Sequence, residues 1–147
     1  MKAGVVGVGK LGRIHGRIYR ELDEWDLVGV SDPVRHEIEH LNGVPWSTDY
    51  RELIDAGVEA VSIATPTVLH HEVAKFFLER GVHCLIEKPI SVTMAEARDL
   101  LETARRNNVF VMVGMVERFN QAYEEARKMI TVPQFIETHR LSPYPNR

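Results

Sequence analysis

The chain has 147 residues, of which 27% are charged and 44% hydrophobic, a balance that argues against both a disordered segment and a membrane protein. Its 18 basic and 21 acidic residues give a net charge of −3 without any long run of like charge, so we expect no nucleic-acid partner. The single cysteine, Cys84, lies in an apolar run, and we expect a buried, reduced thiol. A signal peptide and a membrane-spanning run are not recognisable, which predicts a cytoplasmic protein without a membrane partner.

Short runs rich in Val and Ile alternate along the chain with longer segments of helical spacing. Parallel strands need a covering crossover between them, so this alternation predicts an α/β fold, a Rossmann-type doubly wound parallel sheet with helices on both faces. In chain order we expect a strand at 3–8, a helix at 11–22, a strand at 26–31, a short helix, a weak strand near 44–46, a helix at 49–57, a strand at 58–64, a helix from 67 to 81, a strand at 82–86, a helix from 93 to 108 and a strand at 109–113.

Local signals mark where several of these helices begin. Two helix starts have the form of a capping box, Asp49 with Glu52 and Thr93 with Glu96. The first helix has an apolar stripe whose members recur at helical spacing on one face: Leu11, Ile14, Ile18 and Leu22.

The end of the chain differs in pattern from the part before it. Residues 120–130 have helical spacing, and residues 135–141 alternate like a strand with one solvated face. An isolated strand buries too little surface to be stable by itself. We therefore expect a nucleotide-binding domain at 1–120, followed at 121–147 by a linking helix and the first strand of a truncated second α+β domain, and we interpret the chain as a fragment.

Residues 7–12 read Gly-Val-Gly-Lys-Leu-Gly between the first predicted strand and the first predicted helix. In a dinucleotide-binding loop Gly7 would make the tight turn, Gly9 would let the backbone approach a diphosphate, and Gly12 would let the helix lie close to the sheet. The N–H groups and dipole of the helix start favour that anion. Lys10 and Leu11 complete the candidate cofactor-binding loop, and the alternative is that the glycines only shape a turn.

Asp32 stands twenty residues after Gly12, at the end of the second predicted strand. In that position a carboxylate accepts hydrogen bonds from the adenosine ribose and repels a 2′-phosphate, which predicts NAD as the cofactor. Arg35 follows three residues later, so NADP stays possible. The structural alternative is that Asp32 only caps the next helix.

Ligands of doubly wound sheets bind at the carboxyl ends of the strands, so the loops after the later strands are further candidates. After the fourth strand, Thr65 and Pro66 would hold backbone flat against a cofactor, and His70 would contact it or serve only as a helix-start residue. No metal site is predicted.

The fifth strand is followed by Glu87-Lys88-Pro89, a charged pair at the end of a buried run. The Lys88 ammonium can donate hydrogen bonds to a substrate hydroxyl and stabilise an alkoxide, which makes it the candidate catalytic residue; a surface ion pair is the alternative. After the sixth strand, Arg118, with Asn120 beside it, is a candidate for binding a hydroxyl-rich or anionic substrate.

Together these motifs resemble the glucose-fructose oxidoreductase and inositol dehydrogenase family, with Glu87-Lys88-Pro89 as the most specific signature. The resemblance implies NAD(P)-dependent hydride transfer at a carbinol carbon of a sugar, cyclitol or sugar nucleotide. It places Glu87, Lys88 and Pro89 at the cofactor, Lys88 also at the substrate, and makes a cis peptide common before Pro89. It also places the proton-transferring residues in a second domain, so this chain would bind cofactor without turnover.

Residues 114–120 are similar to the variant found among sugar-nucleotide dehydrogenases, although Met115 and Gln121 replace its His and Pro. Full-length relatives usually associate through the second domain, so the full-length protein is expected to be a homo-oligomer. The alternative function is a non-catalytic dinucleotide-binding regulator or sensor, since the family contains a co-repressor.

Overall fold

The computed structural model describes residues 1–35, 37–135, 137 and 139. The chain divides into two compact units, Met1–Met115 and Val116–Arg147. Among the described residues, the first unit holds the sheet and three α-helices, and the second holds one α-helix.

The first unit contains a six-stranded sheet in the order β3-β2-β1-β4-β5-β6, with every pair of neighbouring strands parallel. The order reverses between β1 and β4, which is the switch point at which such sheets bind ligands. The predicted doubly wound parallel sheet is therefore confirmed. The strands are β1 (Lys2–Val6), β2 (Asp26–Ser31), β3 (Trp46–Ser47), β4 (Ala60–Ile63), β5 (His83–Ile86) and β6 (Val111–Val113).

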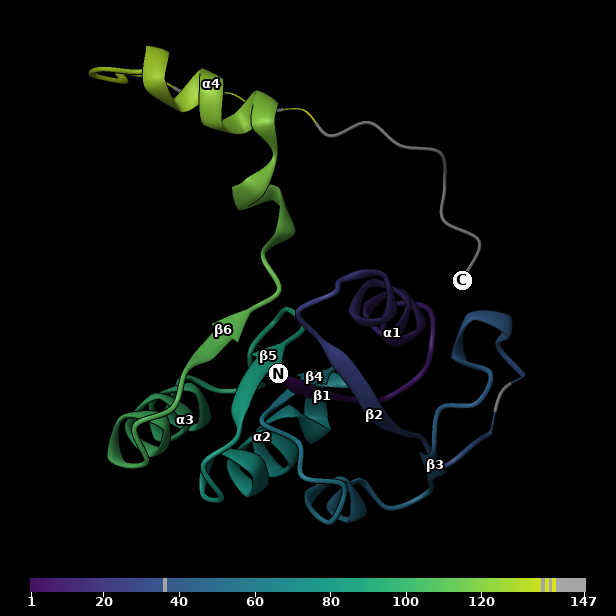
Figure 1. Cartoon of the computed structure of the whole chain (residues 1–147). Coiled ribbons are helices and arrows are strands. Elements are labelled where there is room, and N and C mark those ends of the chain that lie inside the picture. The colour runs from purple at the N-terminus through teal and green to yellow at the C-terminus, as the bar shows by residue number, and fades with distance from the viewer. Residues whose placement is uncertain (36, 136, 138, 140–147) are drawn as a thin grey trace. The chain divides into compact units, whose positions relative to one another are not determined.

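Helices cover both faces of the sheet, with α1 on one face and α2 and α3 on the other (Figure 1). One apolar core lies beneath α2 and α3 and includes Phe77, Ile63 and Leu100, which are fully buried. A second core lies beneath α1 and includes Val5 and Val30. The helices of this unit are α1 (Gly12–Glu21), α2 (His70–Leu78) and α3 (Met94–Arg106), with 3₁₀ turns η1 (Glu39–Leu41), η2 (Tyr50–Ile54) and η3 (Thr67–Leu69).

Helix α1 packs on the sheet through a face made of two glycines and one tyrosine. The apolar stripe predicted from the sequence lies on another, partly exposed face of the helix. Gly12, Gly16 and Tyr19 are buried, and the Tyr19 hydroxyl is 2.8 Å from Ser62 Oγ of β4. A β-carbon on Gly16 would lie 2.8 Å from Leu41 Cδ2, so the helix approaches its neighbours closely there. The stripe residues are 40% to 44% exposed: Leu11, Ile14, Ile18 and Leu22.

The two predicted capping boxes have different outcomes. The box at the start of α3 is confirmed, because Thr93 Oγ1 accepts from the Glu96 N–H and the Glu96 carboxylate accepts from the Thr93 N–H. The box at Asp49 is wrong. Its carboxylate accepts from the Arg51 N–H at 3.0 Å, two residues on, and the segment forms the 3₁₀ turn η2 rather than an α-helix. A hydrogen bond from the Asp49 carboxylate to a backbone N–H only two residues on closes a local turn. The Glu52 N–H, which a capping box would pair with the carboxylate, donates to the Asp49 carbonyl oxygen instead.

The second unit begins with the 3₁₀ turn η4 (Val116–Phe119) and continues with α4 (Gln121–Met129), which confirms the helix expected near 120–130. The strand expected over 135–141 falls largely outside the described residues, and the assignment of 121–147 to a second domain stays a prediction. Among the described residues, no helix combines the length and apolar character needed to cross a bilayer.

Cys84 of β5 is a buried free cysteine, as its apolar surroundings predict. Burial raises the pKa of its thiol well above the usual range, so almost no thiolate forms near neutral pH. We expect dithiobis(nitrobenzoate) to react with the folded chain at least on the order of a hundredfold more slowly than with the chain in guanidinium chloride. Absorbance of the released thiolate measures both rates, with free glutathione as the control for the reagent. Equal rates would contradict the burial.

Candidate functional site

The loop between β1 and α1 has a shape that glycine alone permits at two positions. Gly7 has a φ of +85°, and a β-carbon there would lie 2.8 Å from the backbone of Ala64 and Thr65 after β4. A β-carbon on Gly12 would overlap the carbonyl oxygen of Gly7. The loop therefore turns tightly at the switch point, and α1 begins directly against the end of β1.

Gly9, at the tip of the same loop, is in the opposite situation. A β-carbon there would meet no atom within 4 Å, so the backbone faces open space. The start of α1 has no side-chain cap and no acidic residue in its first turn. The first N–H groups of a helix have no partner within it and carry the positive end of its dipole. This arrangement suits an anion that comes close to the backbone, such as a diphosphate, and Lys10 and Leu11 are exposed beside it.

Asp32, directly after β2, links two loops through its carboxylate. Oδ2 accepts from the Val8 N–H at 2.7 Å, and Oδ1 accepts from the Val34 N–H at 2.9 Å. Each carboxylate oxygen has a second lone pair, so both can accept a further hydrogen bond from a ligand. Asp32 therefore shapes the glycine loop and still offers acceptors, which goes beyond the helix-capping alternative.

A cavity of about 400 Å³ lies where β1, β2 and β4 end. Its walls include Gly7, Pro33, Thr65 and Leu69, so it adjoins both the glycine loop and the loop after β4. The Thr65 hydroxyl oxygen is buried and has no hydrogen-bond partner among the described residues. Most of the exposed surface inside the cavity is apolar, which suits a flat heteroaromatic ring.

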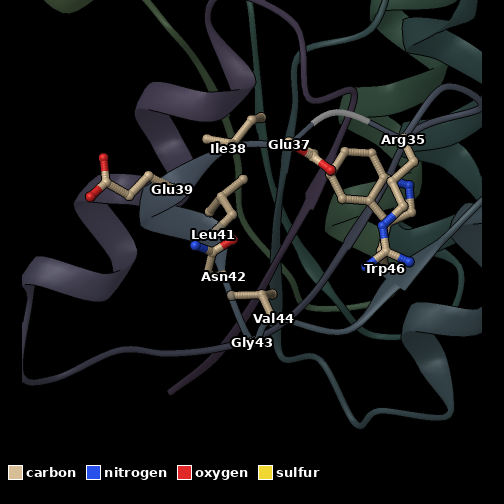
Figure 2. A pocket seen from close by; sticks show the side chains of 9 residues that line it. All are labelled: Arg35, Glu37, Ile38, Glu39, Leu41, Asn42, Gly43, Val44 and Trp46. Carbon is tan, nitrogen blue, oxygen red and sulfur yellow. The ribbon is translucent and has the colours of Figure 1, made fainter.

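A larger cavity, of about 660 Å³, opens beside η1 and β3 (Figure 2). Figure 2 shows Arg35 and Trp46 on one side of it and Glu39 on the other. None of its lining residues comes from the glycine loop or from the loops after β4, β5 and β6. Ligands of this fold bind at the switch point of the sheet. The cavity of about 400 Å³ is therefore the better candidate for the ligand site, although it is the smaller of the two.

The Glu87-Lys88-Pro89 turn follows β5, and its peptide bond between Lys88 and Pro89 is cis. Glu87 is buried, and its Oε1 lies 2.9 Å from His15 Nε2 on α1. Lys88 is exposed, and no carboxylate of the described residues lies within ion-pair distance of it. Lys88 therefore does not form, with any described residue, the surface ion pair that was the alternative.

Thr65, Pro66 and His70 follow β4 as expected. Pro66 is exposed, whereas His70 is 1% exposed and its ring nitrogens lie 2.9 Å from the Thr65 carbonyl oxygen and 2.8 Å from the Pro89 carbonyl oxygen. His70 therefore connects the loop after β4 to the loop after β5. This supports the alternative in which His70 is a helix-start residue with structural contacts. Both ring nitrogens of His70 already face carbonyl oxygens of this chain, so neither is free to contact a cofactor.

Arg118 and Asn120 belong to the second unit. Arg118 is exposed on η4, and Asn120 caps α4, with Oδ1 accepting from the Ala122 N–H at 3.0 Å and Nδ2 donating to Glu117 at 2.9 Å. Their assignment to substrate stays a prediction.

His15 had no part in the sequence-based prediction of the site, and Gly114 entered it only as the first residue of the motif at 114–120. His15 contacts Glu87, and a β-carbon on Gly114 would lie 3.1 Å from the Glu87 carboxylate. The only sequence signal for His15 is its place one helical turn after Gly12, which does not indicate a partner 72 residues away.

A parallel sheet in this strand order, with a glycine loop at its switch point and an acid at the end of the next strand, defines a dinucleotide-binding domain of the Rossmann type. Residues 1–115 match the family model described as "Oxidoreductase family, NAD-binding Rossmann fold". The chain belongs to this family, the Gfo/Idh/MocA oxidoreductases, as the motifs indicate.

Several of the similar curated proteins are named dehydrogenases. The UDP-N-acetylglucosamine 3-dehydrogenase of Acidithiobacillus ferrooxidans is 35% identical over 100% of this chain and 47% of its own length. The NAD(+)-dependent scyllo-inositol 2-dehydrogenase of Bacillus subtilis is 32% identical over 88% of this chain and 40% of its own. The chain thus spans less than half the length of these relatives.

Solved structures agree with the fold. A structure of the A. ferrooxidans enzyme matches with a TM-score of 0.79 at 34% identity, covering 88% of this chain and 43% of that one. GenD2 from gentamicin A biosynthesis, solved in complex with NAD, matches with a TM-score of 0.83 at 26% identity, covering 88% of this chain and 38% of that one.

The contrast between Gly9 and Gly12 yields a stability test. We expect Gly12→Ala to lower the free energy of unfolding by about 3 kcal/mol, because its methyl group would overlap the Gly7 carbonyl. Gly9→Ala is the matched control and should change that free energy by less than about 0.5 kcal/mol, since its methyl group meets open space. Urea unfolding followed by circular dichroism measures both, and equal losses would refute this description of the loop.

Proposed function

We propose that this chain is the cofactor-binding part of an NAD-dependent dehydrogenase that oxidises a secondary hydroxyl of a sugar, cyclitol or sugar nucleotide. The observation that carries the proposal is the contact of 2.9 Å between His15 and Glu87. It joins the helix that begins at the glycine loop to the turn that presents Lys88. A phosphate-binding loop after β1 and an exposed lysine after β5, with only β4 between these strands, are the two parts that such an enzyme needs in one site.

The residues of the first unit fit a dinucleotide. The open backbone at Gly9 and the uncapped start of α1 would hold the diphosphate. Asp32 would accept hydrogen bonds from the adenosine ribose, and the cavity walled by Pro33 and Leu69 would enclose the adenine. When bound, the nicotinamide ring supplies the acceptor or donor of hydride.

The negative charge of Asp32 favours NAD over NADP, because a 2′-phosphate would lie beside a carboxylate. Arg35 does not reverse this preference: it lines the larger cavity and not the one beside the glycine loop. The NAD-bound structure of GenD2 supports the same choice.

Lys88 would act on the substrate oxygen. Its exposed ammonium can donate hydrogen bonds to a hydroxyl and stabilise the negative charge that develops on the oxygen when its proton is removed and before hydride leaves the carbon. The general base that removes the hydroxyl proton would come from the portion of the relatives that this chain does not span, as the family resemblance implies.

Among the three substrate classes we favour a sugar nucleotide. A relative that matches 100% of this chain is a UDP-N-acetylglucosamine 3-dehydrogenase, and residues 114–120 are similar to the sugar-nucleotide variant of the family. Arg118 would contact the substrate, with Asn120 holding the start of α4. The second candidate, a non-catalytic sensor, has no use for the unpaired lysine at position 88. Association of the full-length protein into a homo-oligomer stays part of this proposal.

Calorimetric titration with NAD, NADH, NADP and NADPH tests the proposal. We expect NAD or NADH to bind at least about tenfold more tightly than its phosphorylated counterpart, because of the charge of Asp32. Gly9→Val should weaken binding by more than about tenfold while the melting temperature stays unchanged, since the added side chain fills the space for the diphosphate. A folded chain that binds none of the four would contradict the proposed function.

A further inference from the structure

Glu87 has an environment that requires a fixed partner. Its side chain is 9% exposed, and its Oε1 lies 2.9 Å from Nε2 of His15, whose side chain is 16% exposed. Its Oε2 accepts from the Lys88 N–H at 3.3 Å. A buried carboxylate is costly unless it is hydrogen-bonded or paired, so the His15 contact holds the Glu87 side chain in one place.

The end of β6 leaves room for this carboxylate. A β-carbon on Gly114 would lie 3.1 Å from Glu87 Cδ and Oε1 and 3.2 Å from Oε2, tighter than ordinary van der Waals contact. The Gly114 N–H donates to the Ile86 carbonyl at 2.8 Å, which keeps β6 and β5 in register there. The Glu87 carboxylate thus lies between α1 and the end of β6, with space for one geometry.

His70 fixes the other end of the same turn. One of its ring nitrogens lies 2.8 Å from the carbonyl oxygen of Pro89 and the other 2.9 Å from that of Thr65. A neutral imidazole donates one such bond, and an imidazolium donates both. Residues 87 and 89 are therefore each held by a histidine from a different helix, and Lys88 stands exposed between them.

We infer that His15 is a positioning residue for Lys88: through Glu87 it fixes the lysine turn relative to the helix that begins at the glycine loop. The inference rests on the proposed function and extends it. A dinucleotide held at its diphosphate by the start of α1 meets Lys88 at its nicotinamide end only if the distance between helix and turn is fixed. His15 lies one turn from Gly12 and touches Glu87, so it joins the two ends of the site directly.

The test compares NADH with ADP-ribose, which has the same adenosine and diphosphate but no nicotinamide. We expect His15→Leu in the 147-residue chain to weaken NADH binding about tenfold and to change ADP-ribose binding by less than about twofold, measured by calorimetry. His15→Gln, which keeps an N–H donor at the place of Nε2, should restore NADH affinity to within about threefold. A loosened domain would weaken both ligands together, so the ratio of the two affinities separates positioning from general stability.

His71→Leu is the matched control. His71 also forms a histidine–carboxylate pair, 2.7 Å from Asp99, but it joins α2 to α3 away from the turn. The His71→Leu substitution should leave the ratio of NADH affinity to ADP-ribose affinity unchanged. If His15→Leu does not fold, His15→Ala, which also lacks the N–H donor, replaces it with the same expectation. Equal loss of both ligands, or no loss of either, overturns the positioning role. Failure of the unaltered chain to bind either ligand would instead refute the proposed function.

Discussion

The close approach of Gly7 and Gly12 is the constraint on which the site depends. The carbonyl oxygen of Gly7 occupies the place of a β-carbon on Gly12, so α1 starts against the end of β1 with no side chain between them. This contact brings the first N–H groups of α1 to the switch point of the sheet. It also brings His15, one turn later, to the end of β5. One backbone contact thus helps to place both the glycine loop at the switch point and His15 beside the turn after β5.

Much of the fold could be predicted from the sequence because the patterns that mark each strand and helix involve residues close together along the chain. Each buried strand is a short run of Val, Ile and similar residues, and each parallel crossover needs a helix, so the order of elements follows from the alternation. The strand at 26–31 and the capping box at Thr93 occur as predicted. The glycine loop and Asp32 were also recognisable, because their functions depend on spacing along the chain.

The remaining features depend on which distant residues meet. Periodicity placed the apolar residues of α1 on one face, but close packing of Gly12 and Gly16 decided that the glycine face lies on the sheet. At Asp49 a bond to the residue two positions on prevailed over the predicted capping box. The contact of His15 with Glu87 joins residues 72 positions apart, and no local pattern contains it.

The carboxylate that gives Asp32 its negative charge also holds two backbone N–H groups. Its carboxylate accepts from the backbone N–H groups of Val8 and Val34, so it holds the glycine loop even when no ligand is bound. Replacement by Gly or Ala would remove the negative charge that the proposed preference for NAD depends on and would also leave two backbone donors without their acceptor. Asn has the same shape without the charge, but its single oxygen can replace only one of the two acceptors, because its NH2 group is a donor. Redesign of this domain for a phosphorylated cofactor is thereby confined to short polar side chains at position 32, whatever the positive charge added around it.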